Sequence, residues 1–376
     1  MINPAGIPFL TLAGAPRERG RIHGETLRPT IHEHKARWQH ELRSELGMEP
    51  EEYIALFLAE TDFVPAIERW TPDLLEEVRG IAEGAGVGFE YTLVRQLSDE
   101  EPWYRFEKKI ELGIRPPESC SALGAWHQRG GPPVIAQNMD SPAYYDDHQV
   151  LLHIQDPSSP VEALVFTVAG KISLAGLNNQ GVGICCNTLL QLDYAIDGLP
   201  EDFIVRGFLA QPNLDEALGF MRRVKHASGQ NYVVGGPDRV LDLECSAHKI
   251  CEFTAYPGAN RVYHTNHPLV NDDQERHNRR LSRMPPDILT WYKNRQTTYA
   301  RFASLEKHLR DPARIVDIDT IKAVLSSHDG PVCIDKGTGV NITLGCLIME
   351  LSAEPVLHLS PGPPCSTPFN SYRFGG

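Results

Sequence analysis

The chain has 376 residues, of which 41% are hydrophobic and 23% are charged, the proportions of an ordinary globular protein. Its formal net charge of −13 argues against nucleic acid or an anionic membrane as a partner, because both attract basic surfaces. No stretch approaches the roughly 18 apolar residues of a membrane span, and the opening residues lack the charged and apolar regions of a signal peptide. We therefore expect a cytoplasmic protein.

The cysteine pattern points to a reducing compartment. Eight cysteines are too few in a chain of this length for a disulfide scaffold. They lack the CxxC pairs of a zinc site, and Cys185 and Cys186 are adjacent within a strand-like run. We expect neither a metal nor an organic cofactor.

The first hundred residues are predicted to be mostly helical. Thr71 and Pro72 form a helix start, in which a capping hydroxyl precedes a proline in the first turn. The apolar residues from Leu74 to Ala82 then fall on one face at helical spacing. Gly84 and Gly86 are expected to end this helix.

After Cys120 the pattern changes to short apolar runs separated by turn residues, which predicts strands. The runs are 150–154, 163–168, 172–175, 182–186, 232–235, 240–244, 343–351 and 356–359. Helical periodicity predicts helices at 22–46, 201–210, 214–224, 286–295 and 298–309. Short strands followed by paired helices indicate stacked antiparallel sheets flanked by helices.

Two strand-like segments around a Gly-Gly turn form a predicted hairpin. The first runs from Cys120 to Trp126 and the second from Pro133 to Asp140, with Gly130 and Gly131 between them. This arrangement places Cys120 at the open end of the hairpin. It also carries the carboxylate of Asp140 back to the level of the thiol.

One chemistry suits a cysteine in this position, namely self-cleavage of the peptide bond between Ser119 and Cys120. The thiol attacks the carbonyl of Ser119 and passes through a thioester that water opens. The freed α-amine, with a pKa of roughly 7.7–8.0, then serves as the base for a thiol whose usual pKa is about 8.5. The competing interpretation is a buried structural thiol, because free cysteine is among the most buried residue types.

A charged and aromatic stretch, residues 100–109, lies between Asp99 and Glu118. We interpret this segment as an exposed linker upstream of the cut. Its place in the chain motivates the hypothesis that it covers the nascent site before cleavage and moves away afterwards.

A series of motifs extends in order along most of the chain. They are GAPRERGRIHG (14–24), EVRGIAEGA (77–85), Cys120, QNMD (137–140), GLNNQGV (176–182) with Asn187, Ala227-Ser228, Leu243-Glu244, HTNH (264–267) and Thr343-Leu344. In order and spacing these motifs resemble the penicillin acyltransferase-like family of autoproteolytic acyltransferases and amidohydrolases. That family is a branch of the N-terminal nucleophile (Ntn) hydrolases.

The resemblance implies a fold and a division of the chain. The fold is α+β, the four-layer αββα sandwich of Ntn hydrolases, with two stacked antiparallel sheets flanked by helices. The chain forms a single domain over residues 1–376, which self-cleavage divides into an α piece (1–119) and a β piece (120–376). The pieces are expected to stay associated, because both contribute to one core.

The resemblance also implies roles near the nucleophile. The family's aspartate matches Asp140 and orients the α-amine, with a simple turn cap as the competing interpretation. The family's asparagine matches Asn266 and donates its amide to the oxyanion of the tetrahedral intermediate. His264 and His267 flank Asn266, but no acidic or sulfur-bearing residue near them in the sequence completes a metal site.

Five further residues are weaker candidates for the pocket or for processing. Asn187 either lines the pocket or holds a loop, and Ser228 matches a serine that the family uses around the cleavage site of the precursor. Ser119 precedes the cut, and Asn138 is expected to support the hairpin. Glu244 is expected to be structural, because an inward carboxylate at the end of an apolar strand needs a partner.

The chain departs from the namesake acyltransferase of the family at two places. That enzyme has an arginine shortly before the strand that begins here at Thr343, whereas Lys336 is the nearby cation of this chain. Ser119 stands where that enzyme has glycine. The apolar run from Val134 to Ala136 lacks the arginine that bile-salt and ceramide hydrolases carry there, so the match is to the acyltransferase-like branch.

Three functions remain open at this point. The favoured one is an amidohydrolase, in which Cys120 attacks a small-molecule N-acyl amide and water releases the acid from an acyl-thioester. The second is an acyltransferase, in which an amine intercepts the same thioester and acyl-CoA is a possible donor. No glycine-rich loop or basic cluster stands out as a site for the phosphates of CoA, which favours hydrolysis over acyl transfer from acyl-CoA. The third is an unprocessed member of the fold without catalytic activity.

Overall fold

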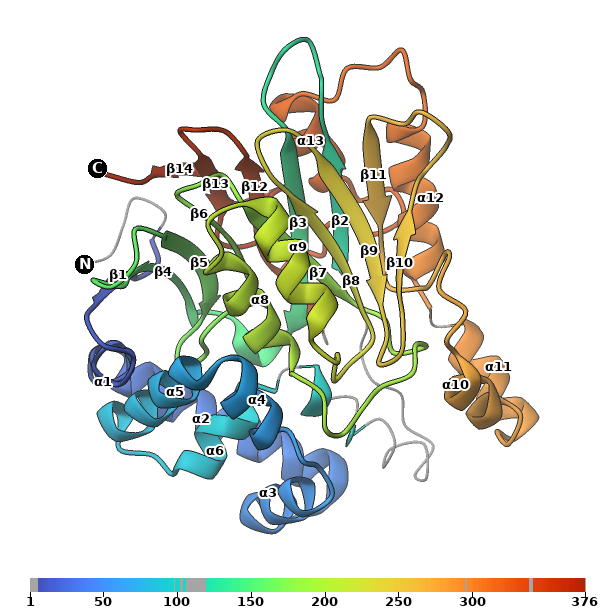
Figure 1. Cartoon of the computed structure of the whole chain (residues 1–376). Helices are drawn as coiled ribbons and strands as arrows, with labels where there is room; N and C mark the ends of the chain where they lie inside the picture. Colours follow the sequence, from blue (N-terminus) through green and yellow to red (C-terminus); the bar gives the residue numbers. More distant parts are fainter. Residues whose placement is uncertain are drawn as a thin grey trace.

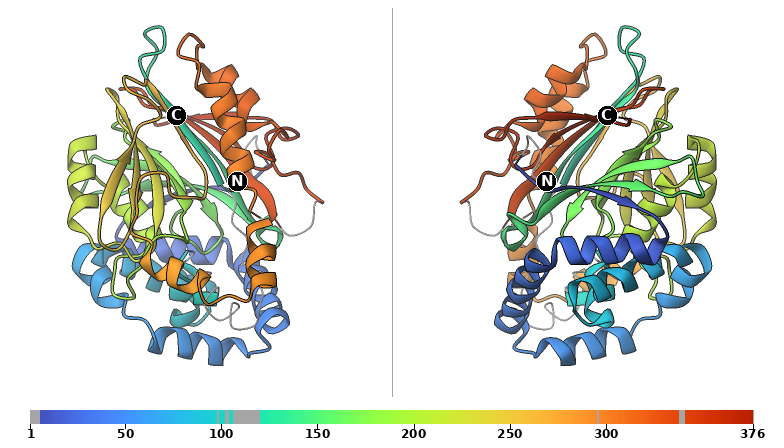
Figure 2. Two further views of the ribbon diagram at one scale, coloured as in Figure 1. Left: turned by 90° about the vertical axis from the view of Figure 1, so that its right-hand side faces the viewer. Right: turned by 90° about the vertical axis from the view of Figure 1, so that its left-hand side faces the viewer.

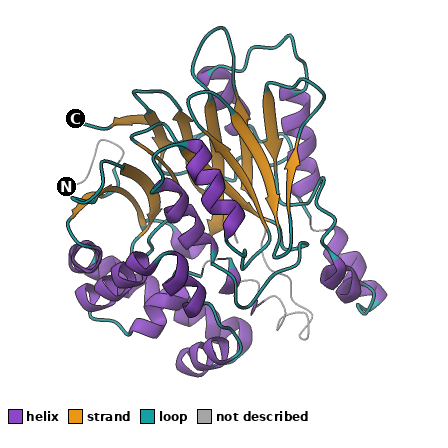
Figure 3. Ribbon diagram, viewed as in Figure 1, coloured by secondary structure: helices purple, strands orange, loops and turns teal. Residues whose placement is uncertain are grey.

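Two β-sheets lie face to face at the centre of the molecule, and helices cover the outer face of each (Figure 3). The computed structural model describes residues 6–97, 99–101, 104, 105, 120–294, 296–337 and 341–375. The predicted αββα sandwich is confirmed. One strand pair departs from the antiparallel expectation, because β1 and β4 are parallel.

The larger sheet has eight strands and the smaller has six. In spatial order the larger sheet consists of β1 (Phe9–Ala13), β4 (Gln149–Gln155), β5 (Glu162–Val168), β6 (Ala175–Asn178), β7 (Gly183–Thr188), β8 (Gln230–Gly235), β9 (Val240–Cys245) and β10 (Ile250–Phe253). The smaller sheet consists of β11 (Arg261–His264), β2 (Cys120–Ala125), β3 (Val134–Pro142), β12 (Asn341–Glu350), β13 (Val356–Ser360) and β14 (Asn370–Arg373). The predicted hairpin is therefore present as β2 and β3, inside the smaller sheet.

Most of the described helices form three groups around the sheets, and α10 (Glu275–Leu281) and α11 (Pro286–Asn294) lie apart from these (Figure 1). The first group gathers at one end of the sheets and comprises α1 (Pro16–Thr26), α2 (Arg28–Leu46), α3 (Pro50–Ala59), α4 (Val64–Trp70), α5 (Pro72–Ala85) and α6 (Phe89–Arg95). The outer face of the larger sheet carries α8 (Glu201–Leu209) and α9 (Leu214–Arg223), and that of the smaller sheet carries α12 (Thr298–Leu309) and α13 (Ile318–Leu325) (Figure 2). A short 3₁₀ turn, Ala143–Tyr145, follows β3, and α10 and α11 precede α12. Within the described residues no helix combines the length and apolar character needed to cross a bilayer.

Three apolar clusters fill the spaces between the layers. One lies between the two sheets and includes Ile135 and Phe166. A second packs α12 and α13 against the smaller sheet and includes Ala136, Leu305 and Leu325. The third joins the larger sheet to α8, α9 and the N-terminal helices. Because side chains alternate along a strand, the consecutive residues Ile135 and Ala136 of β3 serve different clusters.

Glycines allow α1 and α5 to cross in direct backbone contact. A Cβ atom on Gly20 would lie 1.9 Å from the carbonyl oxygen of Glu77, and one on Gly80 would lie 2.1 Å from that of Arg17. Gly84 is part of the same contact, so it lies inside α5 and does not end the helix as predicted. Gly86 ends it, with a left-handed φ of 69° that glycine adopts without steric cost.

Two other helix predictions need correction. Thr71 precedes α5 as predicted, but its hydroxyl donates to the carbonyl of Ile67 at 3.4 Å and does not cap the helix. The predicted helix 22–46 is two helices, α1 and α2, separated at Leu27. Pro29, in the first turn of α2, explains the break, because proline is tolerated there but not inside a continuous helix.

The strand predictions need several changes, and β10 and β14 were not predicted. The first hundred residues also contain a strand, β1, which lies at the edge of the larger sheet. Of the predicted strand 172–175, only Ala175 belongs to a strand, and β6 extends from it to Asn178. An apolar run does not distinguish a strand from a buried loop when it is this short.

The described part of the stretch 100–109 is buried, contrary to the predicted exposed linker. Glu100, Glu101, Tyr104 and Arg105 are between 1% and 6% exposed. Arg105 forms ion pairs with Glu101 and with Glu45 of α2, which neutralise charges that would otherwise favour water. Residues 106–119 lie outside the described residues, and the hypothesis of a covering segment remains untested.

Candidate active site

The pairing of β2 with β3 brings Cys120 and Asp140 to the same end of the hairpin. Cys120 lies opposite Met139, so Asp140 is the next residue along the neighbouring strand. On its other side Asp140 pairs with Thr343 of β12, next to a bulge between Thr343 and Gly345. The predicted return of the carboxylate to the level of the cysteine is thus a consequence of strand register.

Cys120 is held by contacts at its nitrogen, its carbonyl and its sulfur. The backbone N–H donates to Oδ1 of Asn266 at 2.7 Å, and the carbonyl accepts from Nη1 of Arg301. The thiol lies 3.9 Å from the carbonyl oxygen of Asp140. The structure therefore brings together the three residues predicted as catalytic.

Asn266 has a single amide orientation that satisfies all its partners. Its Oδ1 faces two donors, the N–H of Cys120 and Nη2 of Arg301 at 2.8 Å. Its Nδ2 donates to the carbonyl of Thr188 at 3.0 Å. In the reversed orientation, the amide nitrogen would face these two donors and the amide oxygen would face the carbonyl. One of the two hydrogens on Nδ2 is used in this way. The predicted oxyanion contact depends on the other hydrogen and remains a prediction.

Arg301 is a site residue that was not identified from the sequence. It lies in α12 and is fully buried, and its guanidinium also contacts Oγ of Ser121 at 3.2 Å. Its position in α12 is in register with Leu305 and Leu309, which pack against the smaller sheet. The sequence feature that could have identified Arg301 is a cation on the apolar face of a predicted helix. The nearby cation considered before Thr343, Lys336, pairs instead with Asp146 at 2.8 Å.

Asp140 is a buried carboxyl with one satisfied oxygen. Oδ1 accepts from the hydroxyl of Thr343 at 2.5 Å, and Thr343 in turn accepts from the N–H of Ile334 at 2.9 Å. Oδ2 is buried and has no hydrogen-bond partner among the described residues. Burial raises the pKa of Asp140 to about 8, although Thr343 and the charge of Arg301 act in the opposite direction. This carboxyl is largely protonated at neutral pH in the uncut chain.

The thiol of Cys120 is protonated as well. Burial, followed by the charge of Asp140, raises its pKa to about 12, while Arg301 lowers it. In the uncut chain the backbone nitrogen of Cys120 is an amide and accepts no proton. The site therefore holds a protonated thiol beside a neutral carboxyl.

Glu244 fixes the loop that carries Asn266. Its carboxylate accepts from the backbone N–H groups of Leu269, Val270 and Asn271, and from Nε2 of His264 at 2.8 Å. These partners supply what an inward carboxylate needs, and the structural interpretation of Glu244 is confirmed. The sequence did not reveal that this acid lies beside His264, because β9 and β11 belong to different sheets and the two residues meet only where the sheets pack together.

The weaker candidates lie in different surroundings. Asn138 donates to the carbonyls of Leu325 and Val332 at 2.7 and 2.9 Å, which ties the hairpin to the end of α13. Asn187 is buried between the sheets and bonds to Gln137 and Asn231. Ser119 lies outside the described residues.

Ser228 and Asp99 belong to a carboxyl-rich region next to the site. Ser228 donates to Glu100 at 2.7 Å, and Asp99 accepts from the hydroxyl of Thr188, whose carbonyl binds Asn266. Burial and the charge of Asp99 raise the pKa of Glu100 to about 7. Asp99 and Glu100, which precede Cys120 in the chain, are thus bonded to the frame of the site.

Comparison with known proteins identifies one family. The model of the acyl-coenzyme A:6-aminopenicillanic acid acyl-transferase family matches residues 126–336, more than half of the chain. The matched range contains Asp140, Asn266 and Arg301 and begins shortly after Cys120. No curated protein matches the sequence.

Two solved structures are similar to this chain at low identity. One is a mutant of the conjugated bile acid hydrolase from Clostridium perfringens, with 12% identity, coverage of 67% of this chain and 92% of that chain, and a TM-score of 0.45. The other is the penicillin V acylase from Agrobacterium tumefaciens, with 12% identity, coverage of 68% and 85%, and a TM-score of 0.43.

Proposed function

Because this chain belongs to the acyl-coenzyme A:6-aminopenicillanic acid acyl-transferase family, we propose that it is a self-processing Ntn amidohydrolase with Cys120 as its nucleophile. One observation carries the proposal. At the start of β2 the nitrogen of Cys120 is bound by Asn266 and its carbonyl by Arg301, so the residue is fixed on both sides of its thiol.

Processing is the first chemical step of this proposal. The thiol attacks the carbonyl carbon of Ser119, and the bond from that carbon to the nitrogen of Cys120 breaks. The nitrogen takes up a proton and becomes an amine, and Ser119 is left as a thioester on the sulfur. Water then cleaves the thioester, which yields the carboxylate of Ser119 and restores the thiol. Asn266 already accepts a hydrogen bond from the nitrogen that leaves.

Turnover uses the amine that processing creates. The α-amine of Cys120 takes the proton of the thiol, and the sulfur attacks the carbonyl of an N-acyl amide. The proton passes to the leaving amine as the carbon–nitrogen bond breaks, and water releases the acid from the acyl-thioester. The unpartnered Oδ2 of Asp140 is a suitable acceptor for the α-ammonium, and the remaining hydrogen of Asn266 Nδ2 is a suitable donor to the oxyanion.

A second candidate is acyl transfer, which the description of the matching family favours. The same acyl-thioester forms, from an amide or from acyl-CoA, and an amine attacks it in place of water. Both reactions use the same protein groups. They differ only in whether an amine acceptor reaches the thioester before water does.

Intact-mass measurement on freshly folded protein tests the processing step. We expect two pieces, residues 1–119 and 120–376, and an uncut, inactive chain for Cys120→Ala. Cys251→Ala, which changes a partly exposed thiol in β10, is the matched control and should process normally. A full-length species of 41.9 kDa that retains activity would refute the Ntn assignment.

A panel of N-acyl amides, assayed with and without added amine acceptors, tests the reaction itself. Release of free acid that added amines do not reduce identifies a hydrolase. Transfer of the acyl group to the added amine at the expense of free acid identifies an acyltransferase. Processed protein that forms no acyl-enzyme with any member of the panel or with acyl-CoA would contradict both candidates.

A further inference from the structure

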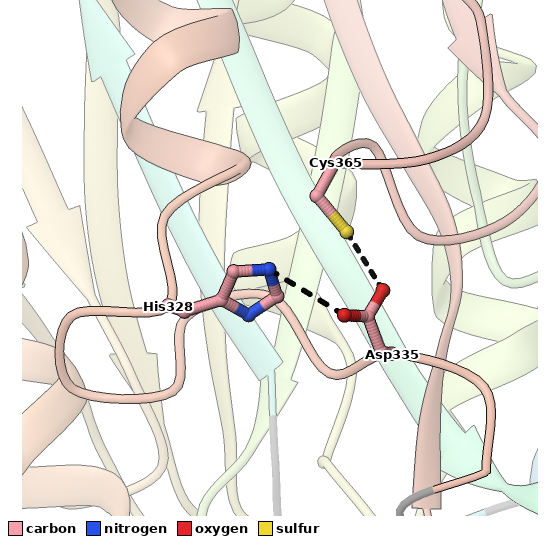
Figure 4. Close-up of side chains that lie close together, drawn as sticks. All are labelled: His328, Asp335 and Cys365. Carbon is pink, nitrogen blue, oxygen red and sulfur yellow. Dashed lines mark hydrogen bonds and ion pairs between the residues drawn. The ribbon is translucent and has the colours of Figure 1, made fainter.

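A second group of reactive side chains lies outside the Cys120 site. His328 and Asp335 are on the connection between α13 and β12, and Cys365 is on the segment that follows β13. Their side chains point toward one another (Figure 4). The sulfur of a fourth residue, the buried Cys333, lies 3.3 Å from that of Cys365. We propose that these four residues form a binding site for a zinc ion.

The ligand atoms of His328, Asp335 and Cys365 all lie within 4.8 Å of one another, and the sulfur of Cys333 lies beside that of Cys365. Zinc binds nitrogen and oxygen at about 2.0–2.2 Å and sulfur at about 2.3 Å, which places neighbouring ligand atoms about 3.3–3.8 Å apart. Nε2 of His328 lies 3.5 Å from Oδ2 of Asp335, and the two sulfurs are 3.3 Å apart. The sulfur of Cys365 and Oδ1 of Asp335 are closer, at 2.8 Å, because the thiol donates a hydrogen bond there. When the thiol binds the ion it releases this proton, and the sulfur and Oδ1 can then move apart.

The orientation of the His328 ring favours a metal ligand. Its Nδ1 lies 3.2 Å from the backbone carbonyl of Cys333, which can accept only from a protonated nitrogen. This contact places the proton on Nδ1 and leaves the lone pair of Nε2 directed toward Asp335. A backbone carbonyl that fixes the tautomer in this way is a common partner of zinc-binding histidines.

The donor set selects the class of ion. Two sulfurs and an imidazole suit zinc and other borderline or soft ions, whereas magnesium and calcium prefer oxygen ligands. Cys365 is exposed and the side chains of His328 and Asp335 are about half exposed, so the ion reaches the site from solvent. Each thiol that binds gives up its proton, so binding through both sulfurs releases two protons per zinc.

The proposed zinc site is connected to the Cys120 site through one short path. Ile334, between two of the ligands, donates its N–H to the hydroxyl of Thr343, which in turn donates to Asp140. An ion at this position would hold the loop that supports the Asp140 carboxyl. The inference does not depend on the proposed amidohydrolase activity, because binding is measured directly.

Cobalt substitution tests the proposal on the full-length protein, kept reduced so that both thiols are available. Cobalt(II) bound by thiolates produces a sulfur-to-metal charge-transfer band in the near ultraviolet, together with visible bands of a tetrahedral ion. We expect one equivalent of cobalt to bind and to produce these bands. Added zinc should displace the cobalt and abolish the bands. Cys365→Ala and His328→Ala should weaken zinc binding at least about tenfold, as loss of a ligand or its support does.

Control variants separate this site from other thiols and from another group of similar composition. His248→Ala disrupts the cluster of Asp193, His248 and Asp273, and should leave the bands unchanged. Cys120→Ala should also leave them unchanged. Without metal, Cys365→Ala should unfold at the same temperature as the parent, and added zinc should raise the unfolding temperature of the parent alone. Absence of the charge-transfer band in the parent, or its survival in Cys365→Ala, would overturn the proposal.

Discussion

Arg301 is a fully buried cation that contacts three groups at the candidate site, the carbonyl of Cys120, the hydroxyl of Ser121 and the amide oxygen of Asn266. Burial of a charge is costly unless its hydrogen bonds are satisfied. These three contacts offset part of the desolvation cost of the buried guanidinium. Its charge lowers the pKa of both Cys120 and Asp140. Arg301 is therefore one of the groups that favour the ionised forms of Cys120 and Asp140.

We predict that Arg301→Ala slows self-processing, and turnover of any amide substrate, by about two to three orders of magnitude. Arg301→Lys should recover part of the loss, because it restores the charge without the paired contacts. The rate is measured by the disappearance of the full-length band on a denaturing gel. Arg310→Ala, at the C-cap of the same helix, is the control, since that side chain is 70% exposed. Equal rates for Arg301→Ala and Arg310→Ala would exclude this role.

The raised pKa of Asp140 predicts a pH-dependent effect of Asp140→Asn on stability. The ordinary value is 3.8 and the folded value is about 8. Between these values the folded chain holds a proton that the unfolded chain releases, so the carboxyl destabilises the fold increasingly as the pH rises. Asparagine is neutral throughout. In an uncut Cys120→Ala background, the gain from Asp140→Asn should therefore grow from pH 5 to pH 8, by about 4 kcal/mol at most.

Urea unfolding at the two pH values measures this difference. Asp317→Asn is the control with the opposite sign, because Asp317 caps α13 and its folded pKa is lowered. Its contribution to stability is complete above its unfolded pKa and is lost only in acid. The loss caused by Asp317→Asn should therefore be the same at pH 5 and pH 8. If Asp140→Asn changes the free energy of unfolding by the same amount at both pH values, Asp140 is ionised in the folded chain and its pKa is not raised.

At the scale of whole elements, the crossing of α1 and α5 depends on the absence of side chains. A Cβ atom on Gly80 would lie 2.1 Å from a backbone carbonyl of α1, where no flexible side chain can move aside. We predict that Gly80→Ala destabilises the protein by about 1–3 kcal/mol or more in thermal or urea unfolding. Helix propensity alone predicts the opposite, a gain of roughly 0.5–1 kcal/mol.

The matched control is Gly219→Ala in α9. There the nearest atom to the new Cβ would be Nη1 of Arg223, at 3.2 Å, which is the free end of a flexible side chain. This variant should be neutral or slightly more stable than the parent. Stabilisation by both alanines would show that the α1–α5 contact has room that its backbone geometry does not indicate.

At the scale of the whole molecule, the proposed cut would separate segments that are packed into one core. Strand β1 of the α piece pairs with β4 of the β piece. Glu77 of α5 is completely buried and forms ion pairs with Arg19 of α1 and Arg206 of α8, so it joins both pieces. The two pieces are therefore expected to remain bound to each other after cleavage.

We predict that the processed protein gives one species by native mass spectrometry and two by denaturing mass spectrometry. Glu77→Gln should lower the stability of the associated pieces by about 3–5 kcal/mol, because it takes the carboxylate partner from the buried Arg206 and one of two such partners from Arg19. Glu76→Gln, one position away and 44% exposed, is the control and should have little effect. Separation of the parent's pieces on native gel filtration would contradict the shared core.

Local patterns in the sequence were sufficient for several features. The apolar period of α12 and the alternation around the Gly-Gly turn predicted the helix and the hairpin, and the hairpin register alone brings Cys120 and Asp140 to one level. These features depend on neighbours within a few residues, or on one turn. The ordered motifs, rather than any single residue, also led to the family and to its layered fold.

Contacts between distant segments were decided only by the tertiary structure. Arg301 reaches Cys120 across 181 positions of the chain, and Glu100, Glu101 and Arg105 are buried although their sequence is that of an exposed linker. The proposed zinc ligands have no recognisable spacing for the same reason. A charged side chain is exposed or buried according to the partners that packing supplies, and those partners come from parts of the chain that no local pattern connects.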